Sequence, residues 1–240
     1  MQPAGMGGRH QYSILFLHGR IGQASHWKTM MEELFQQRKC YAVDFPEHGP
    51  SFRVGNFAFS LLENASLINA LICKLTQSGE KLILVGHDVG GAIAQLSALH
   101  LPEKIAGLIL INSACLTQSL TRVPRGWRIR FFLNGLLQND QSLQESWPGH
   151  YERKVWKKAL LNSTFPSLLL WGKLDPMNLV QMGQGLSKLL SNSNLGVNLC
   201  VHDELGHWPH LEDPQWVLSK MGEFISRVEY AQLQSVCPVA

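Results

Sequence analysis

Residues 81–95, Lys-Leu-Ile-Leu-Val-Gly-His-Asp-Val-Gly-Gly-Ala-Ile-Ala-Gln, decide the fold of this chain. An apolar run leads into a glycine-flanked turn, and a helix start follows directly. This order predicts a buried strand, a tight turn and a helix, the layout of the G-x-S-x-G turn that exposes a nucleophile. The central residue is Asp88 and not serine. A carboxylate suits attack on a saturated carbon, where it gives a stable alkyl ester, better than attack on an ester carbonyl, which gives an anhydride.

The rest of the chain repeats this alternation of apolar, β-branched runs and helical patterns. Such alternation is typical of βαβ units. The expected strands are 12–17, 39–43, 81–85, 106–111, 167–171 and 197–201, and the expected helices are 26–37, 60–77, 90–99, 177–190 and 214–227. We therefore expect an α/β fold, with a mostly parallel sheet of about six strands and helices on both of its faces.

Three local signals mark the ends of these helices. Ser25 is a candidate cap for the first helix, and Asp213-Pro214 fits a cap followed by proline at the start of the last one. Gly79 is expected to end the second helix.

Residues 117–165 interrupt the alternation, because they show no strand pattern. We expect a short helical lid there, inserted into a core formed by 10–116 and 166–228, with a C-terminal tail at 229–240. The lid carries a basic excess in Arg122, Arg125, Arg128, Arg130, Arg153, Lys154, Lys157 and Lys158. An ordinary pair of solvated crossover helices is the alternative, since charge on exposed helices is common.

Bulk composition excludes several classes of protein. A net charge of +3 is too small to favour nucleic acid, and no apolar stretch is long enough to span a membrane. The five cysteines are scattered and the first residues lack a secretory pattern, so we expect a reducing, cytoplasmic setting. Neither metal-ligand spacing nor a nucleotide-binding glycine motif is present, so we expect no metal and no cofactor.

Polar segments follow four expected strands, at the sheet edge where open α/β sheets bind ligands. They are His18-Gly19-Arg20, Gly86 to Gly91, Leu174-Asp175-Pro176 and Gly206-His207. Together with residues 44–51, in this order, they resemble the α/β-hydrolase superfamily over residues 12 to 226.

This resemblance implies a catalytic triad. Asp88 stands at the nucleophile position, Asp175 at the acid position and His207 at the base position. Aspartate at the turn is similar to the epoxide hydrolase and haloalkane dehalogenase branch, in which water activated by the histidine releases an alkyl-enzyme ester. The oxyanion would then lie near the backbone N–H groups of Val89 and Arg20.

The same branch implies substrate-binding roles on the lid and beside the strand ends. Tyr151 would protonate an epoxide oxygen, and Trp127, Trp147 and Trp156 would donate to a leaving halide. His18 is a further candidate, with a structural role in its loop as the alternative.

Other features fit a different branch. Ile21 stands where the aspartate branch has proline, and Val89 where it often has tryptophan. The loop 19–27 is more similar to small esterases, C–C hydrolases and menaquinone-pathway lyases.

Two function classes therefore remain beside an epoxide hydrolase or dehalogenase. One is an esterase, thioesterase or lyase-like enzyme in which aspartate replaces the serine nucleophile. The other is a non-catalytic ligand binder on the same fold. The expected partner is a small-molecule substrate, with an anionic one suggested by the basic lid and Arg20, and no nucleic acid or membrane is expected.

Overall fold

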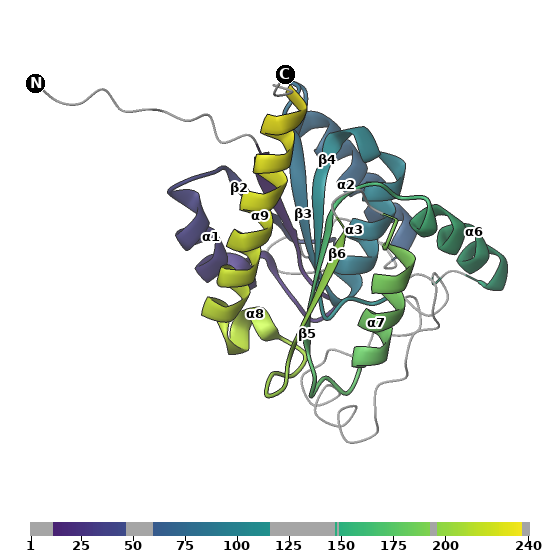
Figure 1. The fold of residues 1–240 in the computed structure, drawn as a ribbon. Helices are drawn as coiled ribbons and strands as arrows, with labels where there is room; N and C mark the ends of the chain where they lie inside the picture. Colours follow the sequence, from purple (N-terminus) through teal and green to yellow (C-terminus); the bar gives the residue numbers. More distant parts are fainter. Residues whose placement is uncertain (1–11, 47–59, 116–146, 148, 193–195, 237–240) are drawn as a thin grey trace, which may run out of the picture.

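The computed structural model describes residues 12–46, 60–115, 147, 149–192 and 196–236. Its centre is a parallel six-stranded sheet with the strand order β2-β1-β3-β4-β5-β6 (Figure 1). The strands are β1 (Tyr12–Leu17), β2 (Cys40–Val43), β3 (Lys81–His87), β4 (Ile105–Ile111), β5 (Ser167–Gly172) and β6 (Val197–His202). The predicted α/β fold is therefore confirmed, and the strands lie where the apolar runs placed them.

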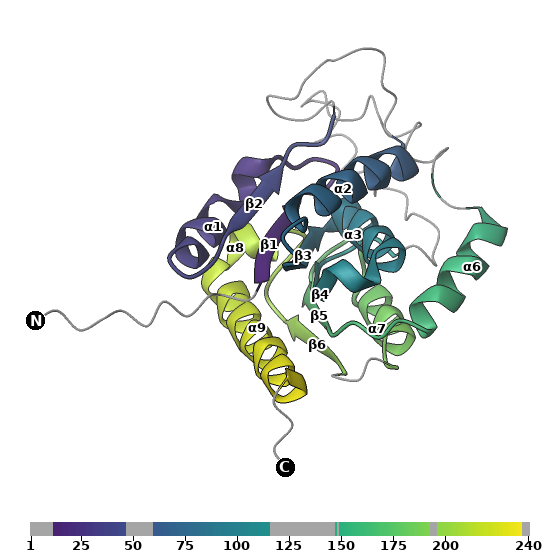
Figure 2. The ribbon, with the colours of Figure 1, turned by 90° about the horizontal axis from the view of Figure 1, so that it is seen from above.

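Helices cover both faces of this sheet (Figure 2). One face carries η1 (Ala24–Trp27), α1 (Lys28–Phe35), α8 (Pro209–Glu212) and α9 (Pro214–Val236). The other carries α2 (Leu61–Leu75), α3 (Asp88–His100), α6 (His150–Leu161) and α7 (Val180–Leu189), and the short η3 (Pro102–Lys104) leads into β4.

The two faces of the sheet bury two separate cores because successive side chains of a strand point to opposite faces. On β1, Leu15 and Leu17 join the core under α2 and α3, whereas Ile14 and Phe16 join the core under α1 and α9. A central parallel strand is thus apolar throughout and not alternating, which explains why these runs were visible in the sequence.

Helix ends were predicted less well. Asp213 does cap α9, since its Oδ1 accepts from the N–H of Trp216 at 3.0 Å. Ser25 caps no helix: it lies inside η1, and α1 begins only at Lys28. α2 ends at Leu75, before Gly79, whose φ of 85° serves the turn that follows.

Two further differences concern the later helices. α7 begins at Val180 and not at 177, because the preceding residues form the loop that carries Asp175. α9 continues to Val236, beyond the expected end at 227. Of the expected lid, residues 116–146 and 148 lie outside the described part of the chain, and α6 is the helix described within 149–165.

Candidate active site

The turn between β3 and α3 holds Asp88 at the carboxyl ends of the strands. Asp88 is the first residue of α3 and has a φ of 49°, a left-handed conformation that aspartate tolerates better than most residues. Its flanking glycines are required by close packing. A Cβ on Gly86 would lie 2.5 Å from the Cα of Gly91, and a Cβ on Gly90 would meet the carbonyl oxygens of Leu17 and His18. The sharp turn therefore depends on glycine at both positions.

Each carboxylate oxygen of Asp88 accepts a hydrogen bond. The backbone N–H of Arg20 donates to Oδ2 at 3.2 Å, and the side-chain amide of Asn178 donates to Oδ1 at 3.0 Å. Burial alone would raise the pKa of Asp88, but the charges of His207 and Arg20 and the Asn178 hydrogen bond outweigh it and lower the pKa. Asp88 is therefore a carboxylate at neutral pH, although only 6% of it is exposed.

His207 and Asp175 form a buried pair beside this carboxylate. Nδ1 of His207 donates to Oδ2 of Asp175 at 2.8 Å, which leaves Nε2 as the ring nitrogen that can take a proton from water. Burial would lower the pKa of His207, but the hydrogen bond and charge of Asp175, together with the charge of Asp88, raise it above its usual value. The ring thus lies close enough to Asp88 for the two charges to influence each other.

The loop between β5 and α7, residues 173–179, carries Asp175 and is called the acid loop below. Several further donors hold Asp175 in place. The backbone N–H groups of Met177 and Asn178 donate to Oδ1 at 2.7 and 3.1 Å. The amide of Asn112 donates to Oδ2 at 2.7 Å. Because these donors fix the plane of the carboxyl group, Asp175 can orient His207.

Asn112 and Asn178 were not predicted from the sequence. Asn112 directly follows β4 and has a φ of 37°, and its side-chain oxygen accepts from the N–H of Gly172 at 2.8 Å. Asn178 follows Asp175 by three residues, and 4% of it is exposed. The available signal was position: each lies just beyond a strand end, where polar side chains meet.

His87 contacts both the backbone and the ring of His207. Its Nε2 donates to the backbone carbonyl of His207 at 2.8 Å, and its ring centroid lies 4.8 Å from that of His207. Burial first, and then the charge of His207, lower the pKa of His87 to about 3. His87 is therefore neutral and holds the His207 loop in place.

His18, proposed above as a substrate contact, holds its own loop. Its Nδ1 donates to the carbonyl of Gly19 at 2.7 Å, and its Nε2 accepts from the N–H of Phe45 at 3.1 Å. Because both ring nitrogens contact backbone and the ring is 1% exposed, this geometry favours the structural alternative. Val89, the expected second oxyanion donor, lies in the first turn of α3, where N–H groups have no partner within the helix.

The lid candidates are spread over the surface and the core. Tyr151 on α6 is 76% exposed, and Trp147 belongs to a hydrophobic core cluster. Trp156 packs against His100 with ring centroids 6.0 Å apart, at the end of α3 roughly 18 Å from Asp88 along the helix axis. Trp127 lies outside the described residues.

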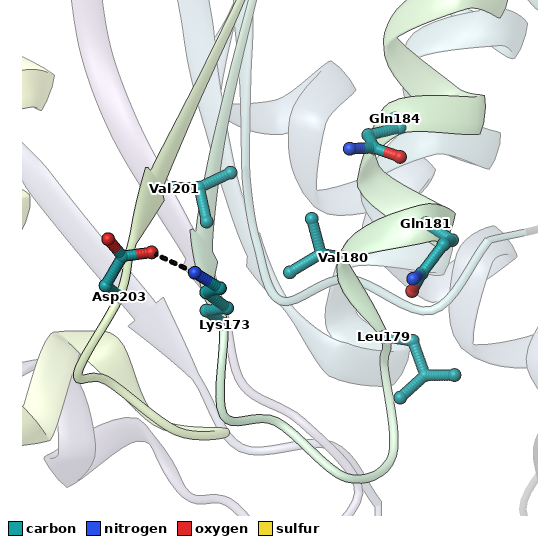
Figure 3. A pocket seen from close by; sticks show the side chains of 7 residues that line it. All are labelled: Lys173, Leu179, Val180, Gln181, Gln184, Val201 and Asp203. Carbon is teal, nitrogen blue, oxygen red and sulfur yellow. Dashed lines mark hydrogen bonds and ion pairs between the residues drawn. The ribbon is translucent and has the colours of Figure 1, made fainter.

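A surface groove of about 560 Å³ lies next to the acid loop, between β6 and α7 (Figure 3). Lys173 and Asp203 form an ion pair of 2.7 Å on one side of it, and Leu179, Val180 and Val201 contribute apolar lining. Neither Asp88 nor His207 lines this groove.

Two features are absent from the described residues. No helix among them is both long and apolar enough to cross a membrane. Nor do they contain a group of three or more His, Cys, Asp or Glu side chains placed to hold a metal ion.

The sequence of this chain matches a known protein family. The family described as "Alpha/beta hydrolase family" matches residues 14–220. The chain is 27% identical over 271 residues to Protein PHYLLO, chloroplastic, of Arabidopsis thaliana, covering 92% of this chain but only 16% of that protein. It is 24% identical over 253 residues to Uncharacterized hydrolase YugF of Bacillus subtilis, covering 89% of each.

A solved structure gives the same fold. The monoacylglycerol lipase of Paleococcus ferrophilus superposes with a TM-score of 0.69 at 19% identity, covering 92% of this chain and 95% of that one.

Proposed function

This chain belongs to the alpha/beta hydrolase family, and we propose that it is a cofactor-free hydrolase that attacks a saturated carbon of an epoxide or a carbon–halogen bond. The observation that carries the proposal is an ionised aspartate, in place of serine, at the turn between β3 and α3. One of its oxygens accepts from the Arg20 N–H, and a His207–Asp175 pair lies beside it.

In the first step an Asp88 oxygen forms a bond to the substrate carbon, and the carbon–halogen or carbon–oxygen bond breaks. The bonding electrons leave with the halide, or with an epoxide oxygen that takes a proton from water. The product of this step is an alkyl ester of Asp88, which is stable enough to need a second step.

In the second step His207 Nε2 takes a proton from water, and the hydroxide attacks the carboxyl carbon of Asp88. Negative charge collects on the former carboxylate oxygen, near the N–H groups of Arg20 and Val89. The ester bond to the substrate then breaks, and the alcohol leaves with the proton from His207. Asp175 stabilises the protonated ring meanwhile, through the 2.8 Å hydrogen bond to Nδ1.

A panel of epoxides, haloalkanes and p-nitrophenyl esters tests this proposal. Wild-type protein is expected to turn over members of the first two groups, and Asp88→Asn, which keeps the shape and the turn conformation, is expected to lose that activity. The proposal would be overturned if the wild-type protein hydrolysed only the esters of the panel and Asp88→Asn kept that activity.

Substrate charge is a separate part of the proposal. The positive charge of Arg20 is felt at Asp88, where it helps to lower the pKa, so a carboxylate on the substrate would meet a cation near the reacting carbon. We therefore expect carboxylate substrates to bind more tightly than matched neutral ones, and added salt to reduce the difference. Equal affinity for both would dismiss an anionic substrate while leaving the chemistry untouched.

An ester-cleaving enzyme is the second candidate, and one observation favours it. Both oxygens of Asp88 already accept hydrogen bonds, so water activated by His207 could attack the substrate directly while Asp88 only holds charge. The solved neighbour named as a monoacylglycerol lipase has the same fold.

Oxygen labelling separates the two candidates once a substrate is known. In a single turnover in ¹⁸O-water, the Asp88 route delivers an unlabelled enzyme oxygen to the product and leaves label in Asp88. Direct attack by water places the label in the product at once.

A further inference from the structure

Asn178 links the two halves of the candidate site. It lies in the loop between β5 and α7 that carries Asp175, yet its side chain reaches the carboxylate at the start of α3. Nδ2 donates to Asp88 Oδ1 at 3.0 Å and to the backbone carbonyl of Asn112 at 2.7 Å. The same residue's backbone N–H donates to Asp175 Oδ1 at 3.1 Å. One residue thus contacts the nucleophile position, the acid position and the end of β4.

The orientation of this amide follows from its neighbours. A carboxylate oxygen and a backbone carbonyl can only accept hydrogen bonds. The NH₂ group of Asn178 must therefore face both Asp88 and Asn112, and each of its two hydrogens has an acceptor. A buried amide with both donors used has little freedom to rotate, so it fixes the position of whatever it contacts.

We propose that Asn178 is the positioning residue of Asp88: its amide holds Oδ1, turns Oδ2 toward the Arg20 N–H, and keeps the carboxyl group ionised and ready to react. This inference rests on the proposed role of Asp88. The side-chain amide of Asn178 contacts the Asp88 carboxylate at Oδ1, so its effect on the reaction passes through that carboxylate.

The surroundings of Asp88 show why such a donor matters. Burial opposes the ionised form, and the groups that favour it are His207, Arg20, His87 and Asn178. His87 is neutral, because its pKa is about 3, and a turnover that begins with the neutral His207 ring gains no positive charge from that ring either. In that form of the enzyme the Asn178 amide, together with the charge and backbone N–H of Arg20, still favours an ionised Asp88 for its attack on the substrate.

The first experiment needs no substrate. Carboxyl ¹³C NMR, with the Asp88 signal assigned by its loss in Asp88→Asn, follows the titration of Asp88 in wild type and in Asn178→Ala. Removal of a donor to the charged form is expected to raise the pKa of Asp88. The exposed Asn162, which follows the C-terminus of α6, gives a matched control, and Asn162→Ala is expected to leave the titration unchanged. An unchanged Asp88 pKa in Asn178→Ala would overturn the inference.

A second pair of variants guards against loss of folding. Asn178→Ser is small and keeps one donor, so a partial effect is expected. Asn178→Asp keeps the shape of the side chain but replaces the donor with a second carboxyl group, so the pKa of Asp88 should rise further than in Asn178→Ala. If both variants fold, the pKa of Asp88 should rise in the order wild type, Asn178→Ser, Asn178→Asp. Any other order would show that Asn178 does not act through Asp88.

Adduct formation gives the functional readout. In a His207→Gln background, where an alkyl ester on Asp88 would accumulate, Asn178→Ala is expected to form the adduct roughly tenfold to hundredfold more slowly at saturating substrate. A missing adduct in the parent background contradicts the proposed function alone, because the NMR result stands without it. Normal adduct formation with Asn178→Ala contradicts the positioning role alone.

Discussion

At the scale of single residues, the site depends on how four polar side chains share their hydrogen bonds. Asp175 directs His207 through Nδ1, and Asn178 and the Arg20 N–H hold the two oxygens of Asp88. Ionised Asp88 and a basic His207 follow from these contacts and not from either residue alone. The sequence placed Asp88, Asp175 and His207 at strand ends, but hydrogen-bond partners come from residues distant in the chain, so Asn112 and Asn178 were not foreseen.

The pH dependence of catalysis should report the state of His207. The neutral ring is needed to take a proton from water, and its pKa is raised above 6.5 by Asp175 and Asp88. We expect kcat, when hydrolysis of the alkyl ester limits it, to rise with pH and to reach half its plateau above pH 6.5, because Asp175 stays hydrogen-bonded to the ring in that intermediate. No separate limb is expected from Asp88, whose pKa is lowered. A pH–rate profile checks this, together with ¹⁵N NMR of His207. A half-plateau below 6.5 would show that the ring is not stabilised in its charged form.

At the scale of elements, backbone contacts between β1, β3 and α3 fix the reactive turn. The apolar run of β3 and the glycines after it were legible in the sequence, because both are local patterns. The C-terminus of α2 and the start of α7 were not, because the loop at each of these ends depends on contacts across the fold. The other end of α2 lies close to where the pattern placed it, and there Ser60 accepts from the N–H of Glu63 at 3.3 Å.

Substitution of the two glycines Gly90 and Gly222 by alanine should have opposite effects. Gly90→Ala puts a Cβ against the carbonyl oxygens of Leu17 and His18. The end of β1 cannot move freely because it is paired on both sides, so we expect a loss of at least about 2 kcal/mol in the free energy of unfolding. Gly222 lies within α9 with open space around its Cα, and Gly222→Ala is expected to add about 0.5 to 1 kcal/mol. Urea unfolding measures both. Equal effects of the two changes would mean that close backbone contact does not fix the turn.

At the scale of the whole molecule, one sheet with two cores brings the ends of β3, β5 and β6 to one edge. This part was predictable, because parallel strands buried on both faces give continuous apolar runs and all their carboxyl ends lie together. Most of the expected lid lies outside the described residues. In its described part, Trp156 and Trp147 contribute to the core under α3 and α7, and aromatic residues on helices pack more often than they react. The basic residues of α6 predicted an exposed helix face, and Lys154, Lys157 and Lys158 are exposed.

Buried neutral histidines should make the folded protein sensitive to acid. Burial lowers the pKa of His87 to about 3 and that of His210 well below its usual value. Above pH 6.5 neither the folded nor the unfolded chain protonates them. Below it the unfolded chain binds protons that the folded chain does not, so stability falls as pH decreases, by about 1.4 kcal/mol per pH unit for each histidine.

His210→Phe isolates one of these contributions. His210 stacks on Trp27 with ring centroids 4.3 Å apart, and its Nδ1 has no hydrogen-bond partner, so phenylalanine can replace the ring without leaving a polar atom unpaired. The slope of unfolding free energy against pH should become shallower below 6.5 and stay the same above it. An identical slope in the variant and the wild type would contradict a neutral, buried His210.

The central claim, that Asp88 itself becomes covalently bonded to substrate, is tested most directly by intact-mass spectrometry of His207→Gln. After exposure to the epoxide and haloalkane panel, we predict a mass increase equal to the whole epoxide, or to the alkyl group less one hydrogen. Peptide mapping should place it on Asp88, and the double variant Asp88→Asn/His207→Gln should show none. The account would be contradicted if the whole panel gave no adduct, or if the same mass increase appeared in the double variant.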